Sequence, residues 1–224
     1  MKKNEDRMTL SCIDCGAKAC DSEGKKHPAF CVSQHTEEKL RDEVRQRYLL
    51  EENKNVMVAS AKVEYENYCQ MTRVQETIEW AKKLHVKKIG IATCVGLLKE
   101  SRVLAKILRN HGFEVYGVGC KVGEIAKVEI GIPEECAQIG CNTCNPILQA
   151  ELLAKQETDI NIVVGLCVGH DSMFYKYSVA PTTTLVVKDR VLGHNPVVAL
   201  YTADTYYATK LIDCNWRGIH EFHL

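Results

Sequence analysis

The pattern of apolar and polar positions divides the chain into three stretches. Residues 1–35 show no sustained periodicity and are rich in turn-forming residues. Residues 36–85 are dense in charged side chains, and their apolar residues recur at helical spacing, which predicts two or three amphipathic helices. In residues 86–224, short apolar runs alternate with helical stretches, as is typical of a parallel sheet with crossover helices. We therefore predict an α/β, Rossmann-like fold with a mostly parallel sheet and flanking helices, preceded by a loop and a helical segment that packs on the main domain.

The third stretch predicts a series of strands and helices. The predicted strands are residues 88–93, 113–118, 160–166 and 184–188. The predicted helices are residues 97–110, 147–155 and 197–211. In an open parallel sheet the carboxyl ends of the strands share one edge, where ligands bind between the loops. The residues that follow each predicted strand are therefore the candidates for function.

Cysteine usage is the strongest compositional signal, with 12 cysteines among 224 residues. The amino terminus lacks the apolar stretch of a signal peptide, and no apolar run reaches the roughly 18 residues that span a bilayer, so we expect a cytoplasmic protein with no membrane partner. In that reducing compartment, so many cysteines favour metal binding or redox chemistry over a disulfide framework. The balance of 29 basic and 29 acidic residues argues against a nucleic-acid partner.

Four cysteines crowd the first stretch with the spacing Cys12-x2-Cys15-x4-Cys20-x10-Cys31. This loop has almost no apolar side chains with which to build a core, so bonds from thiolates to a metal would take the place of one. We predict that all four are metal ligands. The metal is left open between an iron-sulfur cluster, with 4Fe-4S favoured, and zinc. Zinc accepts four thiolates, but the spacing lacks the second close pair that most zinc knuckles have.

A second group of cysteines follows the predicted strands. Cys94 directly follows the first strand, Cys120 lies just past the second, and Cys167 directly follows the third. Cys144 precedes Asn145-Pro146, which favours a helix start, and the positive end of a helix dipole favours thiolate over thiol. Adjacent strands lie about 4.8 Å apart, so we expect these four sulfurs to form a second metal or cluster site. Taken singly, such a cysteine is more often a small buried hydrophobe.

Other cysteines carry less specific signals. Cys136-x4-Cys141-x2-Cys144 matches the spacing of plant-type two-iron ferredoxins but lies in a long irregular loop, so Cys141 is predicted to be a spare or exchanging ligand. Cys69 and Cys214 fall in predicted helices away from the sheet edge, and we expect both to pack.

Histidines at the same edge are candidate catalytic groups. His170 beside Asp171 can donate a proton in the crevice, because imidazole titrates near neutral pH and a carboxylate tunes it; a backbone hydrogen bond within the loop is the alternative. His194 has the same two interpretations, with metal ligation as a third. Lys188-Asp189-Arg190 follows the fourth strand and either binds an anionic substrate or is a solvated strand end.

Several blocks of the sequence resemble one protein family. They are Cys12-x2-Cys15-x4-Cys20 with Phe30-Cys31, Ile89–Leu98, Cys144-Asn145-Pro146, Gly165–Ser172 and Val187–Pro196. Over nearly its whole length the chain resembles a family of unknown function described as cysteine-rich, predicted metal-binding proteins of archaea and anaerobic bacteria. The resemblance implies metal binding and the cytoplasm of an anaerobe, and it supplies no reaction.

Two hypotheses follow. In the first, the chain is an iron-sulfur protein with one cluster in the N-terminal loop and a second at the strand ends, acting in redox or sulfur-transfer chemistry on a small molecule bound among His170, Asp171 and His194. In the second, a structural four-thiolate zinc knuckle is joined to a ligand-sensing or carrier domain without catalytic activity. The sequence leaves open the substrate, the electron-transfer partner, the oligomeric state and whether the protein is an enzyme.

Overall fold

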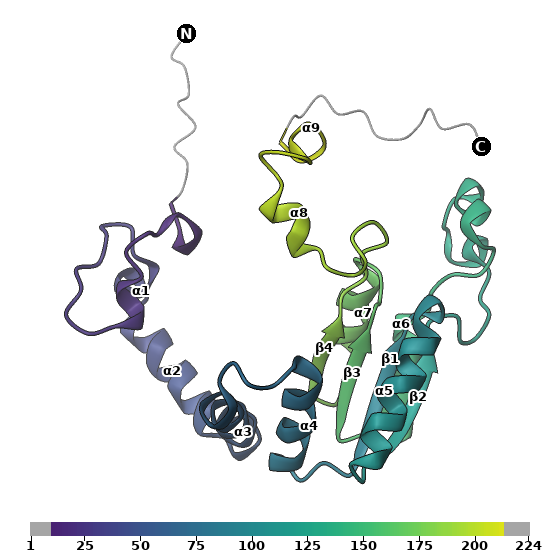
Figure 1. Cartoon of the computed structure of the whole chain (residues 1–224), viewed down its shortest axis with the longest axis horizontal. Helices are drawn as coiled ribbons and strands as arrows, with labels where there is room; N and C mark the ends of the chain where they lie inside the picture. Colours follow the sequence, from purple (N-terminus) through teal and green to yellow (C-terminus); the bar gives the residue numbers. More distant parts are fainter. Residues whose placement is uncertain (1–9, 213–224) are drawn as a thin grey trace. The chain divides into compact units, whose positions relative to one another are not determined.

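The computed structural model describes residues 10–212 and divides into two compact units, Met1–Lys62 and Val63–Leu224 (Figure 1). The described part of the first unit begins with two 3-10 turns, Cys12–Asp14 and Ala19–Asp21. They are followed by α1 (Val32–His35), α2 (Glu38–Leu49) and α3 (Glu51–Asn67), the last of which runs across the boundary between the units. Within residues 10–212, no helix has the length and apolarity needed to cross a bilayer.

The predicted helices of the second stretch form, but α2 buries none of its side chains. Its apolar residues Leu40, Val44 and Tyr48 recur at helical spacing and are all exposed. Local pairs such as Arg45 with Asp42, 2.5 Å apart, support this helix by roughly 0.2–0.5 kcal/mol each.

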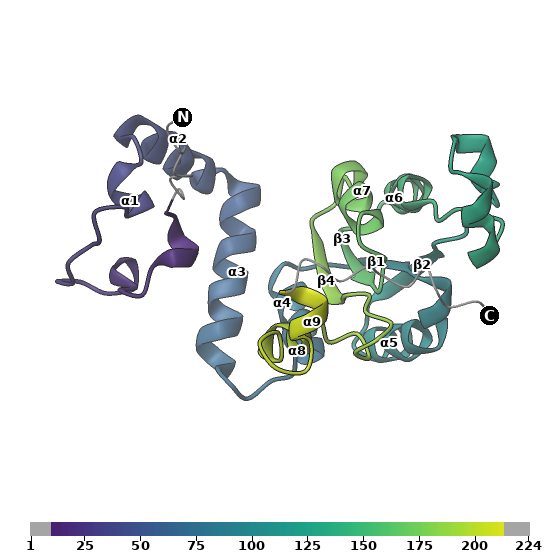
Figure 2. The same cartoon turned by 90° about the horizontal axis from the view of Figure 1, so that it is seen from above.

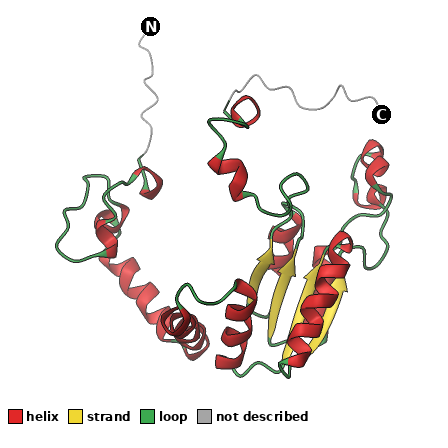
Figure 3. Cartoon of the chain, viewed as in Figure 1, coloured by secondary structure: helices red, strands yellow, loops and turns green. Residues whose placement is uncertain are grey.

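The second unit is built on a four-stranded, all-parallel sheet (Figure 3). Its strands are β1 (Lys88–Thr93), β2 (Glu114–Gly119), β3 (Ile160–Val164) and β4 (Thr182–Val186), in the order β2-β1-β3-β4. The predicted α/β, Rossmann-like fold is therefore confirmed. Thr93 at the end of β1 pairs with Gly119 of β2 and with Val164 of β3, so these three strands end at the same level.

Helices cover both faces of the sheet (Figure 2). The covering helices are α4 (Arg73–Lys83) and α5 (Leu98–Asn110) on one face, and α6 (Pro146–Lys155) and α7 (His170–Tyr177) on the other. Because successive strand residues point to opposite faces, Ile89 and Ile91 of β1 pack toward α5, whereas Ala92 packs with Leu153 of α6 and Phe174 of α7. Both layers bury apolar side chains, which holds the strand ends in fixed positions.

The chain after β4 differs from the prediction. Residues 197–211 were expected to form one helix, but they form two short ones, α8 (Val197–Tyr201) and α9 (Ala208–Leu211). Thr202 ends α8 by donating its hydroxyl to the carbonyl of Val198 at 2.7 Å, and threonine is a weak helix former. The sequence also did not predict α7, the first helix after β3.

Gly90 of β1 tests how tightly the sheet packs against α6. A Cβ at this position would collide with Oδ1 of Asn161, which is fixed by hydrogen bonds to Thr158 and Ser178. We expect Gly90→Ala to lower the free energy of unfolding by about 1–3 kcal/mol, measured by urea denaturation. Gly117→Ala in the same sheet is the control, because its Cβ would meet no atom closer than 3.8 Å. Equal loss of stability in both variants would contradict this account.

Candidate functional site

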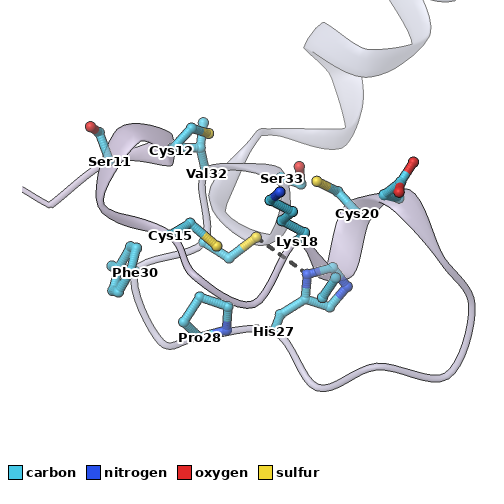
Figure 4. A pocket seen from close by; sticks show the side chains of 13 residues that line it. Ser11, Cys12, Cys15, Lys18, Cys20, His27, Pro28, Phe30, Val32 and Ser33 are labelled. Atoms are coloured by element: carbon cyan, nitrogen blue, oxygen red, sulfur yellow. Dashed lines mark hydrogen bonds between the residues drawn. The ribbon is translucent and has the colours of Figure 1, made fainter. Parts of the chain in front are cut away.

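The four N-terminal cysteines line a single cavity of about 210 Å³ in the first unit, together with His27 (Figure 4). The thiols of Cys15 and Cys20 are directed toward the middle of the loop, and Sγ of Cys31 lies 3.3 Å from Nδ1 of His27. We call this the N-terminal cavity. The sequence had not singled out His27, although a histidine four residues before a cysteine in such a loop is itself a signal for a soft metal.

The loop around this cavity is shaped by short hydrogen-bonded turns. Asp14 accepts hydrogen bonds from the backbone amide and the hydroxyl of Ser11, at 2.8 and 3.2 Å, which fixes the turn that carries Cys12. Ala19 is buried, whereas Cys12 and Cys20 are exposed at the cavity rim. The local fold thus gathers the thiols with very little apolar burial.

Three thiols meet at the carboxyl edge of the sheet in the second unit. Cys94 follows β1 by one residue and Cys120 follows β2 by one residue, so the in-register pairing of these strands brings both to the same place. Sγ of Cys144 lies 3.7 Å from Sγ of Cys120, and the amide of Val95 donates to Sγ of Cys120 at 3.4 Å. We call Cys94, Cys120 and Cys144 the edge thiols.

The start of α6 holds Cys144 in place. Oδ1 of Asn145 accepts the amide of Leu148 at 3.1 Å and Pro146 occupies the first turn, so the predicted helix start is confirmed. The amide of Asn145 also donates to the carbonyl of Cys120 at 2.7 Å, which ties this helix end to the chain after β2.

The edge thiols strongly change one another's protonation. Hydrogen bonding with Cys120, which favours the thiolate of each outer residue, lowers the pKa of Cys94 and of Cys144 to about 5, while the same contacts and burial raise the pKa of Cys120. Cations assist: Lys188 lowers the pKa of Cys94, and the nearby charge of Lys121 lowers that of Cys144. Cys120 therefore keeps its proton while Cys94 and Cys144 ionise. A thiolate is both the nucleophilic and the metal-binding form of cysteine, and here two of them adjoin one thiol.

Cys167 is at the same edge but has a different partner. Nη2 of Arg190 lies 3.1 Å from its sulfur. Cys94 and Cys120 are the first residues after β1 and β2, whereas Cys167 is the third residue after β3. Cys167 is therefore two residues farther along the chain from its strand end. Among the described residues, no hydrogen bond joins Cys167 to the edge thiols.

The other predicted site residues are distributed as follows. His170 begins α7, its charge lowers the pKa of Cys144, and its Nδ1 is buried without a hydrogen-bond partner in the described structure. Asp171 accepts the amide of Ser172, and Nδ1 of His194 accepts the amide of Asp189 at 3.1 Å. His170 is thus near enough for its charge to act on Cys144, whereas His194 bonds to the backbone of its own loop.

The described cysteines outside these groups are solvent-exposed. Cys141 and Cys136 lie in the excursion between β2 and α6, and both are exposed. The expectation that Cys69 packs in a helix is wrong: it is exposed in the turn after α3, with a φ of 57°. Cys214 lies outside the described residues.

Gln149 is a site residue that the sequence analysis missed. It is fully buried on α6, and its Nε2 donates to the carbonyls of Thr93 at 3.2 Å and Val118 at 2.7 Å. Thr93 is the last residue of β1 and Val118 the last but one of β2, so the Gln149 amide fixes the spacing of the strand ends that carry Cys94 and Cys120. The sequence feature that could have identified Gln149 is a single side-chain amide among the apolar residues of the predicted helix 147–155.

The donor side chains of the described residues are gathered but do not yet surround a metal position. Within residues 10–212, no three or more side chains of Cys, His, Asp and Glu stand in a geometry ready to hold a metal ion. The thiols are gathered in two places, and rotation of their side chains would be needed to bring them to bonding distance of one ion, about 2.3 Å for a zinc-sulfur bond.

Comparison with known proteins places the chain in a family. The model of the family described as "Protein of unknown function (DUF1847)" matches residues 31–185, a stretch that includes all three edge thiols. An uncharacterized protein from Methanocaldococcus jannaschii is 45% identical over 209 residues, which cover 91% of this chain and 99% of that protein. The chain therefore belongs to the DUF1847 family of proteins of unknown function.

Proposed function

We propose that this chain is an iron-sulfur protein with two thiolate centres, one in the N-terminal cavity and one at the edge thiols, that carries out redox or sulfur-transfer chemistry on a small molecule. The observation that carries the proposal is the meeting of three thiols from separate segments at one sheet edge, with sulfurs 3.7 Å apart for Cys120 and Cys144. A structural role alone does not require thiols at all three positions.

The chemistry of the donor sets fits a soft metal. Thiolates select iron-sulfur clusters, zinc and copper(I) over hard cations. Two edge thiols already ionise well below the usual pKa of cysteine, so ligation would displace few protons at neutral pH. An iron-sulfur cluster, when bound, supplies one-electron transfer and, at an iron without a protein ligand, a place for a substrate atom.

The surrounding residues have roles of their own in this proposal. Lys188 and Lys121 offset the negative charge of the thiolates, and Gln149 keeps Cys94 and Cys120 at a constant spacing. His170, next to Cys144 and with an unpartnered Nδ1, is the group placed to hold or release a proton. A small-molecule substrate and an electron-transfer partner are the expected partners.

A zinc-binding carrier module is the second candidate. His27 beside Cys31 gives the N-terminal cavity nitrogen as well as sulfur donors, and Cys3His is a frequent set in structural zinc sites. In that case the first unit would need its metal only for folding, and the edge thiols would have a separate, metal-independent role.

Metal content distinguishes the two. We expect full-length protein made without oxygen to contain iron and acid-labile sulfide and to show broad visible absorption that dithionite bleaches. Cys15→Ser should remove the metal of the N-terminal cavity alone, and Cys120→Ser that of the edge thiols alone, whereas Cys69→Ser, an exposed control, should change neither. Circular dichroism of each variant reports whether it folds.

Each outcome has a defined meaning. Zinc in a colourless sample, lost in Cys15→Ser and retained in Cys120→Ser, would replace the redox proposal with the carrier module. No bound metal in protein purified without oxygen would overturn both.

A further inference from the structure

The loop after β4 carries two cations, Lys188 and Arg190, that lie near thiols at the carboxyl edge of the sheet. Lys188 lies beside the Cys94 thiol, and Nη2 of Arg190 lies 3.1 Å from Sγ of Cys167. The ion pairs found within residues 10–212 involve neither of them. The guanidinium has five N–H donors and the ammonium three, so the contacts with Cys167 and Cys94 use only a part of their hydrogen-bonding capacity.

The one carboxylate between these cations is committed elsewhere. Oδ1 of Asp189 accepts the amides of Val191 at 2.9 Å and Leu192 at 2.8 Å. The ring of His194 and its backbone amide bond to the backbone of Asp189 at 3.1 and 2.9 Å. Asp189 and His194 thus build a hydrogen-bonded turn, and within residues 10–212 Asp189 forms no ion pair with Lys188 or Arg190.

The loop stands at the switch point of the sheet. In the order β2-β1-β3-β4, the connection from β1 runs to β2 on one side, whereas the connection from β3 runs to β4 on the other side. Open α/β sheets bind ligands at the carboxyl ends of the two neighbouring strands whose connections diverge in this way, here β1 and β3. The amide of Cys94 donates to Val164 at 3.1 Å and that of Gly165 to Val186 at 2.7 Å, so the ends of β1, β3 and β4 adjoin.

Glycines keep this place open. A Cβ on Gly96 would lie 3.8 Å from Sγ of Cys94 and 3.9 Å from Nζ of Lys188, so Gly96 faces both groups without covering them. Gly165, with a φ of 67°, admits Leu97 to a position that any Cβ would block. The backbone is therefore shaped to bring a cation and a thiol to the same surface.

We propose that Lys188 and Arg190 form a subsite for the oxyanion group of a small anionic substrate, at the switch point between β1 and β3. This names the substrate class of the crevice and rests on the proposed function for the reaction that follows. A planar guanidinium can bind two oxygens of one carboxylate or phosphate, and the ammonium adds a point charge. The rest of such a molecule would then lie over Cys94 and Cys167, within reach of the edge thiols.

Anion binding to the full-length protein tests the subsite. Calorimetric titrations with inorganic phosphate and with acetate, at an ionic strength held constant with chloride, should show saturable binding of one anion per chain. The two arms distinguish a phosphate from a carboxylate. Lys188→Gln and Arg190→Gln should each weaken binding by about tenfold or more, because each removes a charge-assisted hydrogen bond. Lys155→Gln, at the exposed end of α6, is the matched control and should leave binding unchanged.

Failure of the subsite and failure of the proposed function give different results. No saturable binding of either anion, or equal binding in Lys188→Gln, Arg190→Gln and the wild type, would overturn the inference, and the two cations would then serve only to stabilise thiolates. Metal analysis of the same samples reports on the proposed function. Anion binding that persists in protein without metal would leave the subsite standing while the iron-sulfur proposal falls.

Discussion

Cys144 of the metal-free protein should be alkylated by iodoacetamide at a rate that changes less than twofold between about pH 6.5 and 8.5. Its pKa of about 5 means that the sulfur is already ionised throughout this range. A cysteine with the ordinary pKa of about 8.5 gains reactive thiolate roughly fifty-fold over the same interval. Timed labelling followed by peptide mapping gives the rate at each cysteine.

The urea-unfolded chain is the matched control, because Cys144 there has lost its folded neighbours and should follow the ordinary profile. The same ionisation affects stability. The unfolded chain keeps these protons up to about pH 9, so the stabilisation by the Cys94 and Cys144 thiolates is fully present above that pH and is lost as the pH falls through about 5. A urea midpoint that does not rise between these values would contradict the lowered pKa values.

Mild oxidation of the metal-free protein should join Cys120 to Cys144 in a disulfide. Their sulfurs are 3.7 Å apart, so a modest rotation of the side chains reaches the bond length of about 2.05 Å. The Cys144 thiolate and the Cys120 thiol give up two electrons and one proton as the S–S bond forms, and diamide, which takes these and a second proton from water, becomes the hydrazine. We expect one predominant disulfide by peptide mapping under non-reducing conditions, and loss of all metal uptake at the edge thiols until the bond is reduced.

Two variants test which cysteines form this disulfide. Cys144→Ser should abolish the disulfide, and Cys167→Ser should leave it intact, because Cys167 contacts Arg190 and, within the described residues, has no hydrogen bond to the edge thiols. A disulfide that instead links Cys120 to Cys167, or oxidation confined to the exposed Cys141, would show that the arrangement of the sulfurs described here is wrong.

The fold was predictable where burial dominates. The apolar runs of β1 and β3 are buried on both faces of the sheet, and such strands leave a continuous apolar signal in the sequence. Helix α7 was missed because its eight residues bury only Phe174 completely and its polar start reads as a loop. The single helix expected at 197–211 failed because local hydrogen bonds of Thr202 outweigh the apolar pattern on either side.

The candidate site was predictable to the level of strand ends. Placing a cysteine immediately after a strand was enough to bring Cys94 and Cys120 together, since parallel strands end at one edge. The prediction extended β3 to Leu166, two residues beyond its end at Val164, and this error made Cys167 look equivalent to them. The buried amide of Gln149 depends on contacts between distant segments, which periodicity does not encode.

The bridge that Gln149 makes between the ends of β1 and β2 has a mechanical consequence. Because one buried amide donates to both carbonyls, the separation of the backbone at these two strand ends is set by the interior of the protein and not by whatever binds at the sheet edge. A centre held this way would change its oxidation state with little movement of its anchors, which is the condition under which electrons transfer with a small reorganisation of the surroundings.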